Sequence, residues 1–422
     1  MIIKNIKYII TMNQKRDIIK NGIISIENDI IKYIGNGSHV KKERDELVID
    51  GSGMVAMPGL INTHTHSPMT LLRGYADDLP LMKWLNEKIW PMEAKFKPKD
   101  FYYGSLLACL EMICFGVTTF SDMYSHPDQI LKAVKESGLR AMISPVIFEN
   151  VNSKCNVKNA EKFLKYKSEM ITPALGPHSP YACSKEELEE IGEISKEKNT
   201  KIHIHISETK NEVIEIRKKY GMTPVEFLDT IGLMNERTML VHSIWVSNKE
   251  INIIRKRKSS VVHCPISNMK LASGVMPIQK MNNITVSLGS DGPSSNNNLD
   301  MFEEMKFTAL LHKLHNLNPV LIPAEKTLEM ATINGAKTLE MENKIGSIEI
   351  GKKADIILVD FKKLHLVPVY SPISHLVYSS NGNDVDTVIC DGKILMQNRK
   401  FNIDKMDITK RVEKIREELL KR

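Results

Sequence analysis

The sequence of 422 residues predicts an α/β fold, in which a (β/α)8 TIM barrel is joined to a small β domain built from both chain ends. Three observations support this prediction. Short apolar, β-branched runs alternate with helical stretches through the middle of the chain. Both chain ends consist of short strand-like segments instead. Histidines and one aspartate stand at the ends of several of the apolar runs.

The barrel strands are predicted from runs rich in Ile, Val and Leu that are bounded by turn residues. They cover residues 54–62, 117–121, 140–147, 171–175, 201–207, 238–242, 259–264 and 284–289. Helical candidates between them cover residues 82–95, 100–115, 127–137, 185–198, 224–231 and 248–255. One short apolar run is ambiguous, but regular alternation with helices favours a parallel barrel. Its active site would lie at the carboxyl ends of the strands.

The chain ends predict a second unit made of strands. Residues 1–10 and 22–33 are rich in isoleucine, and Asn28-Asp29 offers a hairpin turn. Residues 355–359, 386–390 and 393–396 have the same character, and Asp391-Gly392 joins the last two. We therefore expect a composite β-sandwich domain of residues 1–55 and 350–422, with the barrel in residues 56–349.

The composition is that of an ordinary globular protein, 42% hydrophobic and 26% charged. The net charge of +7 is dispersed among acids, as in KKERDE, which argues against a nucleic-acid partner. Six scattered cysteines without a C-x-x-C pair favour reduced thiols in the cytoplasm. Lys4, Asn5 and Lys7 interrupt the N-terminal apolar residues, so no signal peptide is predicted, and no apolar run is long enough for a membrane span.

A metal site is predicted from imidazoles at the strand ends. His64 and His66 follow the first run as H-T-H, and strand alternation points both rings the same way. His205 shares a face with His203 in KIHIHISE, and Asp291 ends ITVSLGSD. Three imidazoles and a carboxylate from different barrel strands can hold one divalent ion and leave room for a water. Hydrogen-bonded core histidines are the alternative.

Two further residues near these ligands suggest proton transfer. Glu208 comes three residues after His205, where a carboxylate would reach both a water and a substrate ring. The alternatives for Glu208 are a surface acid or a helix N-cap. His242 ends the sixth run and could orient an attacking water, or it could be a satisfied core histidine.

Several motifs resemble the amidohydrolase superfamily over essentially the whole chain. DGSGMVAMPGLINTHTH resembles the entry to its barrel and GSIEIGKKADIILVD the exit, with GVTTFSDM, HIHISET, VHCPISN and LGSDGPSSNN between them in the expected order. Within the superfamily the chain is most similar to the 5′-methylthioadenosine/S-adenosylhomocysteine deaminases, including relatives that act on 5′-deoxyadenosine. The resemblance implies hydrolytic deamination of 5′-substituted adenosines, or adenosine itself, to inosine analogues and ammonia.

The resemblance also implies roles for individual residues. His64, His66, His205 and Asp291 would bind one divalent ion, zinc first, with iron, nickel and manganese as alternatives. Glu208, His242 and Asp291 would be catalytic, with Glu208 shuttling protons, and Glu208 and Asp291 would also contact the substrate. Glu93 in WPMEAKF would pair with the ribose hydroxyls, and His178 in LGPHSPYACS would help to hold the nucleoside. A homo-oligomer, dimer or tetramer, is expected.

Three features bear on the subclass. The fourth strand offers no lysine for a second metal, so one ion is favoured. The apolar segment with Leu79, Met82, Trp84, Trp90 and Met92 would suit a lid over a 5′ substituent, or else helix packing on the barrel. The loop FENVNSKCNVKNAEKF lacks the arginine that some relatives direct at the homocysteine carboxylate. Guanine, cytosine and triazine hydrolases on the same scaffold, and a non-catalytic barrel, are the rival functions.

Overall fold

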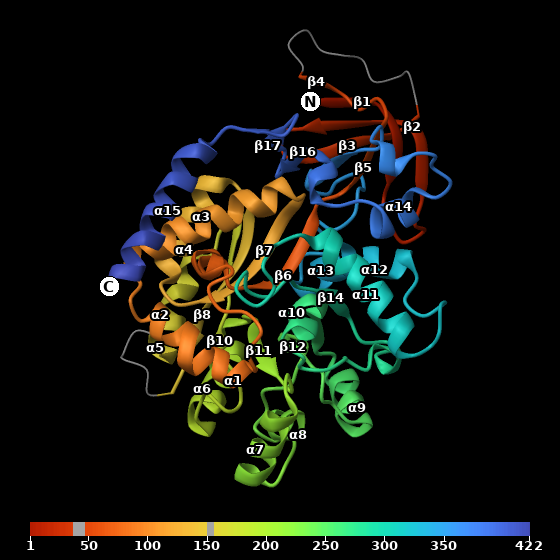
Figure 1. Ribbon diagram of the computed structural model, residues 1–422. Coiled ribbons are helices and arrows are strands. Elements are labelled where there is room, and N and C mark those ends of the chain that lie inside the picture. The colour runs from red at the N-terminus through yellow and green to blue at the C-terminus, as the bar shows by residue number, and fades with distance from the viewer. Residues whose placement is uncertain (37–46, 150–155) are drawn as a thin grey trace.

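Two parallel sheets form the framework of the central part of the chain (Figure 1). The computed structural model describes residues 1–36, 47–149 and 156–422. One sheet has the order β10-β8-β7-β6, with β9 beside β8, and the other has the order β11-β12-β13-β14. The strands are β6 (Leu60–Thr65), β7 (Val117–Tyr124), β8 (Arg140–Ile147), β9 (Ile171–Pro173), β10 (Gly176–Pro177), β11 (Ile202–Ile206), β12 (Thr238–His242), β13 (Ser260–His263) and β14 (Val286–Leu288). Every predicted barrel run therefore contains a strand.

The two parallel sheets meet along two edges. Leu175 and Ile202 form an isolated parallel bridge between the first sheet and β11. Beyond β14, the backbone N–H of Asp291 donates to the carbonyl of His64 at the end of β6, over 3.0 Å. The carboxyl ends of β6, β11 and β12 consequently face a common region, where the predicted site residues lie.

Strands from both chain ends form a third sheet of nine strands. Its order is β18-β17-β16-β15-β5-β1-β2-β3, with β4 paired to β1. The strands are β1 (Ile2–Ile10), β2 (Ile18–Glu27), β3 (Ile30–Gly35), β4 (Val48–Asp50), β5 (Met54–Pro58), β15 (Ile356–Asp360), β16 (Val385–Cys390), β17 (Lys393–Gln397) and β18 (Lys400–Phe401). The turns expected at Asn28-Asp29 and Asp391-Gly392 join β2 to β3 and β16 to β17. The two ends of the chain thus build one sheet together.

The first predicted barrel run, residues 54–62, is two strands instead of one. β5 pairs with β1 and β15 of the terminal sheet, whereas β6 pairs with β7. The break falls at Gly59, where a Cβ atom would lie only 2.2 Å from Oγ1 of Thr118. A glycine is therefore needed where the chain crosses from one sheet to the other.

Helices alternate with the parallel strands and lie outside them (Figure 1). The α-helices are α1 (Leu81–Trp84), α2 (Trp90–Glu93), α3 (Pro98–Cys114), α4 (Pro127–Ser137), α5 (Val157–Phe163), α6 (Lys185–Lys198), α7 (Lys210–Tyr220), α8 (Pro224–Thr230), α9 (Asn248–Arg257), α10 (Pro265–Lys270), α11 (Met301–His315), α12 (Ala324–Met330), α13 (Ile333–Thr338), α14 (Pro372–Tyr378) and α15 (Lys405–Lys421). The 3-10 segments are η1 (Ser67–Leu72), η3 (Leu164–Tyr166), η4 (Ile278–Lys280), η5 (Leu364–Leu366) and η6 (Gly382–Asp384).

The predicted helix at residues 82–95 is broken into three pieces. α1 and α2 flank η2 (Leu85–Ile89), a wider π-helical turn. Pro91 has no backbone N–H, so a regular α-helical hydrogen-bond ladder cannot run through this segment. The segment keeps a helical course, and it leaves Trp84 and Leu85 buried while Met82 and Trp90 are exposed.

A buried arginine ties the parallel strands to the terminal sheet. Arg140 begins β8 and is 1% exposed. Its guanidinium lies 3.3 Å from Oδ1 of Asp355 and 3.1 Å from Oδ1 of Asp391, and it donates to the carbonyl of Glu169 over 2.8 Å. Asp355 and Asp391 flank the strands β15 and β16, so this network fixes one sheet against the other.

None of the helices in the described part of the chain is long and apolar enough to span a membrane. No disulfide joins the cysteines that the structure describes, which are Cys109, Cys114, Cys183, Cys264 and Cys390.

Candidate active site

A cavity of about 700 Å³ lies at the carboxyl ends of the parallel strands. Seven of the residues singled out from the sequence line it: His66, Glu93, His178, His205, Glu208, His242 and Asp291. The eighth, His64, is fully buried against this group. The structure therefore brings all of the predicted site residues together in one place, from β6 to the loop after β14.

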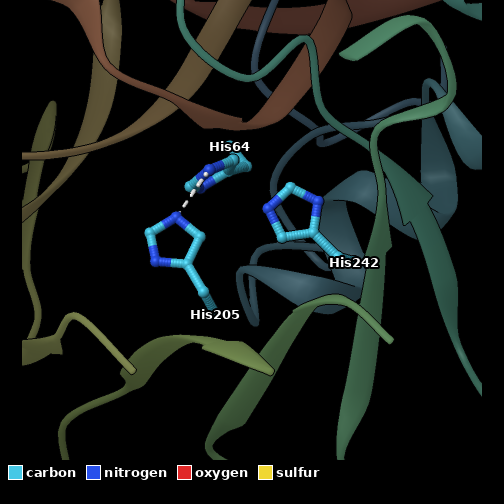
Figure 2. A group of neighbouring side chains, drawn as sticks. All are labelled: His64, His205 and His242. Carbon is cyan, nitrogen blue, oxygen red and sulfur yellow. Dashed lines mark hydrogen bonds between the residues drawn. The ribbon is translucent and has the colours of Figure 1, made fainter. Parts of the chain in front are cut away.

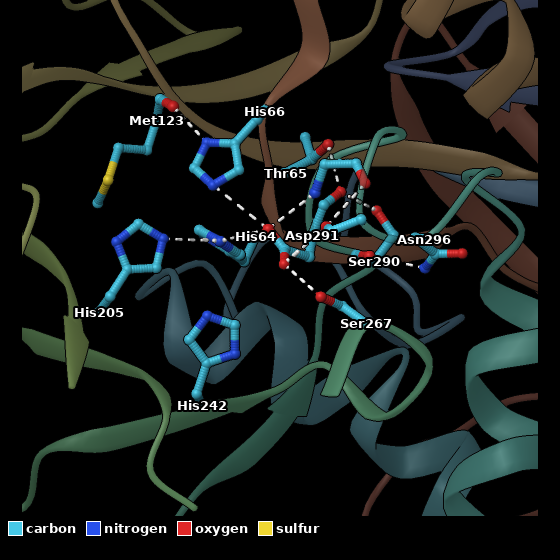
Figure 3. Close-up of polar contacts among 12 residues, drawn as sticks. His64, Thr65, His66, Met123, His205, His242, Ser267, Ser290, Asp291 and Asn296 are labelled. Atoms are coloured by element: carbon cyan, nitrogen blue, oxygen red, sulfur yellow. Dashed lines mark hydrogen bonds and ion pairs between the residues drawn. The ribbon is translucent and has the colours of Figure 1, made fainter. Parts of the chain in front are cut away.

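Possible metal donors gather beside the cavity in two groups that share His64: His64, His66 and Asp291 form one, and His64, His205 and His242 form the other (Figure 2 and Figure 3). Oδ1 of Asp291 lies 3.3 Å from Nε2 of His64 and 3.3 Å from Nε2 of His66. Nε2 of His205 lies 3.2 Å from Nε2 of His64. Three imidazole nitrogens and one carboxylate oxygen in this arrangement are the donor set that a divalent ion such as zinc prefers.

The outer nitrogens of these imidazoles are held by second partners. Nδ1 of His66 donates to the carbonyl of Met123 over 2.6 Å, and Nδ1 of His205 donates to the carbonyl of His178 over 2.7 Å. Nδ1 of His64 lies 2.8 Å from Nε2 of His203. Because a backbone carbonyl can only accept, Nδ1 of His66 and of His205 carries a proton, and the Nε2 lone pair of each ring can bind a metal once the ring is neutral.

The protonation states in this group also suit a metal. Burial lowers the pKa of His64 to about 3 and holds that of His205 well below its usual value, so both rings are neutral. Burial acts in the same direction on His66, but hydrogen bonding and attraction to Asp291 outweigh it and raise the pKa of His66, so this ring would give up a proton when a metal binds. Burial would raise the pKa of Asp291, but hydrogen bonds with His64 and His66 outweigh it and the carboxyl stays ionised. Neutral imidazoles and an ionised carboxylate are the forms that bind metals.

Asp291 is fixed by its own loop as well as by the histidines. Its Oδ2 atom accepts hydrogen bonds from the Ser267 hydroxyl at 2.6 Å and the Ser295 hydroxyl at 3.0 Å, which leaves Oδ1 for the histidine side (Figure 3). The loop approaches β6 closely, since a Cβ atom on Gly289 would lie 2.9 Å from the backbone nitrogen of His64. A glycine in LGSD is therefore required for this approach.

His242 is close to the metal donors but is held in the opposite tautomer. Its ring stands beside those of His64 and His205 (Figure 2). The side-chain Nδ2 of Asn268 donates to Nδ1 of His242 over 3.0 Å, so the proton sits on Nε2. In this tautomer His242 offers an N–H donor to a group in the cavity, while one of its ring nitrogens also lies within 4.8 Å of donor nitrogens of His64 and His205.

Glu208 is a buried carboxyl on the cavity wall. It is 8% exposed, and burial, assisted by the negative charge of Asp291, raises its pKa to about 8. Its Oε2 atom lies 3.7 Å from Nε2 of His242, and Ser273 donates to Oε1 over 3.4 Å. A carboxyl with a pKa near neutrality can both accept and donate a proton during a reaction.

The predicted substrate residues lie on other walls of the cavity. Glu93, at the end of α2, accepts a hydrogen bond from the Tyr124 hydroxyl, and burial raises the pKa of Glu93 to about 8. The ring of His178 stacks on Phe148 with centroids 4.5 Å apart. Part of the apolar lining comes from the segment predicted either to cover the substrate or to pack on the barrel, through Leu81, Met82, Trp84, Leu85 and Trp90.

Three residues that hold predicted site residues in place were not singled out from the sequence. Tyr124 bonds to Glu93, Asn268 to His242, and Glu212 to the backbone N–H groups of Ser207 and Glu208. Asn268 belongs to VHCPISN and Glu212 follows HISET, so the motifs pointed to their neighbourhood but not to their contacts. The loop that lacks an arginine after the third predicted strand falls partly on residues 150–155, which lie outside the described residues.

Comparisons with known proteins agree with this site. The pattern of the amidohydrolase family matches residues 55–395. A 5′-deoxyadenosine deaminase of Methanosarcina mazei is 46% identical over 100% of this chain and 99% of its own length. A 5-methylthioadenosine/S-adenosylhomocysteine deaminase of Thermoanaerobacter pseudethanolicus is 44% identical over 100% of both chains.

A solved structure agrees as well. The adenosine deaminase of Xanthomonas campestris, crystallised with bound zinc, superimposes with a TM-score of 0.96 at 31% identity, over 100% of this chain and 98% of that one. With the family pattern matching most of the sequence and relatives aligned over its full length, this chain belongs to the amidohydrolase family.

Proposed function

We propose that this protein deaminates 5′-substituted adenosines by hydrolysis, giving inosine analogues and ammonia. The substrate class comprises 5′-methylthioadenosine, S-adenosylhomocysteine, 5′-deoxyadenosine and adenosine. The observation that carries the proposal is that Glu208 and His242, 3.7 Å apart, line the same cavity as Glu93 and three of the proposed metal ligands. The names of the two full-length relatives support the same substrates.

One divalent ion would be held by His64, His66, His205 and Asp291, with zinc first and iron, nickel or manganese as alternatives. The convergence of their donor atoms and the outward-facing Nδ1–H groups support this assignment. When bound, such an ion lowers the pKa of water from ~15.7 towards ~7.

The chain's own residues would move the protons. Glu208 takes a proton from the attacking water and delivers it to the ring nitrogen beside the reacting carbon. The Nε2–H group of His242 and the carboxylate of Asp291 hold the attacking oxygen in line with that carbon. The attacking oxygen bonds to the carbon, and the C–N bond to the amine breaks as the remaining hydroxyl proton passes to the amine, which leaves as ammonia. Catalytic roles are therefore proposed for Glu208, His242 and Asp291.

The far part of the cavity would bind the rest of the nucleoside. Glu93 would accept hydrogen bonds from the ribose hydroxyls, and His178 would hold the nucleoside, with Glu208 and Asp291 at the reacting edge of the base. The wall of Leu81, Met82 and Trp84 would cover the 5′ substituent. Among the residues described for this structure, no Lys or Arg lines the cavity, which favours an uncharged 5′ group.

We infer that the two parallel sheets close into one (β/α)8 barrel, because hydrogen bonds join them at both edges. The terminal sheet, from residues 1–55 and 350–422, would form a separate β-sandwich domain, because buried side chains of β1–β5, β15 and β16 make a core of their own. Free thiols at every described cysteine favour the cytoplasm.

We also infer a homo-oligomer, dimer or tetramer. An apolar stripe with helical spacing runs along α11 and past its end, and the exposed residues in it are Phe307, Leu310, Leu314 and Leu317. A second copy of the chain is the partner that we propose for this stripe. Light scattering of wild type and of Leu314→Lys would test it, with a smaller particle expected for the variant.

The first test of the function is ammonia release from a panel of substrates, with and without chelator. The panel contains 5′-methylthioadenosine, S-adenosylhomocysteine, 5′-deoxyadenosine, adenosine, guanine and cytosine. We expect chelator-sensitive release from the adenosine derivatives. Release from free bases alone would refute the nucleoside assignment.

A further inference from the structure

A carboxylate behind the cavity holds the turn that carries Glu208. Glu212, in the first turn of α7, is 4% exposed and is not among the residues that line the cavity. Its Oε1 atom accepts the backbone N–H of Ser207 at 2.7 Å, and its Oε2 atom accepts the backbone N–H of Glu208 at 2.9 Å. Each carboxylate oxygen of Glu212 therefore accepts a hydrogen bond from one of two consecutive backbone N–H groups.

Neighbouring helices use a glutamate at the same helix position differently. α6, α8 and α9 begin with a capping box, in which this glutamate accepts the backbone N–H of its own N-cap residue. The pairs are Ser184 with Glu187, Thr223 with Glu226, and Ser247 with Glu250. In α7 the N-cap is Thr209, but Glu212 reaches past it to the two residues before it. The carboxylate of Glu212 therefore supports the turn after β11 as well as the helix.

The same turn is also tied to the turn that carries His242. Ser207 adopts a left-handed φ of 49° at the end of β11, a conformation that needs support. Its carbonyl accepts hydrogen bonds from the backbone N–H groups of Ile244 at 3.1 Å and Trp245 at 2.9 Å, just after His242. The Ser207 peptide is thus held from both sides, by Glu212 and by the turn after β12.

We propose that Glu212 is a positioning residue for the deamination: it fixes the backbone from which Glu208 reaches the substrate, and it does so relative to His242. This inference rests on the proposed function. Proton transfer requires the carboxyl to lie within hydrogen-bond reach, and a misplacement of about 1 Å can lower a rate by on the order of 100-fold.

Glu212→Gln tests the proposal, because the amide keeps one acceptor and turns an NH2 group towards the second backbone N–H. We expect kcat to fall on the order of 10- to 100-fold, with KM within about twofold of wild type and metal content unchanged. Glu187→Gln is the matched control, since it alters the capping box of α6, and its kcat should equal that of wild type. A Glu212→Gln variant with wild-type kcat, or one whose loss follows a loss of bound metal, overturns the proposal.

A double-mutant cycle separates positioning from general support of the fold. If Glu212 acts through Glu208, Glu212→Gln should lower the residual kcat of Glu208→Gln by less than about twofold. A full multiplicative loss in that background overturns the proposal. Glu212→Asp keeps both oxygens but shortens their reach, and we expect the same selective loss of kcat. If both Glu212 variants are insoluble while Glu187→Gln is soluble, Glu212 is a folding residue and the proposal is wrong.

The kinetic measurements also distinguish a failure of the proposed deaminase function from a failure of the role proposed for Glu212. Wild-type protein that releases no ammonia from any adenosine derivative refutes the proposed function. Wild-type turnover with an unaffected Glu212→Gln variant refutes only the role of Glu212.

Discussion

Oε2 of Glu208 lies 3.7 Å from Nε2 of His242, so a carboxyl and an imidazole face the same part of the cavity without bonding closely to each other. The carboxyl has a pKa raised to about 8 by burial, while the imidazole is held by Asn268 with its proton on Nε2. One group can exchange a proton with a bound molecule and the other can donate a hydrogen bond to it.

Glu208→Gln should abolish most turnover while leaving the metal donors intact. The amide cannot accept and return a proton, and general acid–base catalysis typically contributes ~100- to 10,000-fold. We expect kcat to fall by that amount, with one metal ion per chain as in wild type. Ammonia release and elemental analysis of the same preparation provide the measurement, and near-wild-type turnover would remove Glu208 from the mechanism.

Removal of the metal should abolish activity reversibly. Chelator treatment should leave less than about 1% of wild-type turnover, and added zinc should restore it, because water has a pKa of ~15.7 without an ion. His66→Ala removes a donor whose ring lies 3.3 Å from Asp291, and it should weaken metal retention under the same dialysis. Met123, which only anchors the ring through its carbonyl, offers a control: Met123→Leu should keep the metal. Full activity of the chelated protein would contradict the metal site.

Much of the fold could be predicted because it depends on local patterns. Apolar runs bounded by turn residues identify the strands, and H-T-H at a strand end directs both His64 and His66 to one face. The split at Gly59 was not predicted, although Pro58-Gly59 is a turn signal inside residues 54–62. The sequence does not show that β5 pairs with the terminal strands while β6 pairs with β7.

The residues that orient the site could not be predicted for a similar reason, because their contacts join segments that the local sequence pattern does not connect. In SETKNE, Glu212 has the spacing of an ordinary helix-capping acid, and its contact with the amides of Ser207 and Glu208 depends on the turn after β11. The contact of Asn268 with His242 joins two different strand ends. Motifs therefore predict the candidate ligands and the candidate proton carrier, while the residues that orient them depend on tertiary structure.

Glu93→Gln should weaken binding of ribosides selectively. Burial keeps the Glu93 carboxyl neutral near pH 7, and a neutral hydrogen bond contributes about 0.5–1.5 kcal/mol, so kcat/KM for the best adenosine derivative should fall about 2- to 10-fold. The Tyr124 hydroxyl can still donate to the amide oxygen, so the cavity wall should keep its shape. Steady-state kinetics check this, and an unchanged kcat/KM would make the nucleoside assignment wrong.

The same substitution should change the pH dependence of stability. The pKa of Glu93 is about 8 in the folded protein against an ordinary value of 4.5, because burial disfavours the charged form. The unfolded chain therefore loses this proton first, and stability falls as pH rises from about 4.5 to about 8. Chelated wild type and chelated Glu93→Gln should differ little below pH 4.5. Above pH 8 the variant should melt higher, by roughly 2–4 °C. A pH-independent difference would contradict the buried, neutral carboxyl.

Asp355→Asn should destabilise the contact between the parallel strands and the terminal sheet without altering the chemistry. Arg140 is 1% exposed, and its guanidinium would lose the charge of its 3.3 Å partner, keeping Asp391 as its ionised partner and the carbonyl of Glu169 as a neutral acceptor. Removing one member of a buried ion pair typically costs about 3–5 kcal/mol, because the remaining charge cannot return to water. Asp407→Asn is the control, since the pair of Asp407 with Arg411 is half exposed and should contribute less than about 1 kcal/mol.

Thermal unfolding should separate the two variants, with the lower melting temperature for Asp355→Asn. The kcat of the folded fraction should stay at the wild-type value, because Asp355 is not among the residues that line the cavity. Equal melting temperatures for both variants would show that the Arg140 network does not hold the two sheets together.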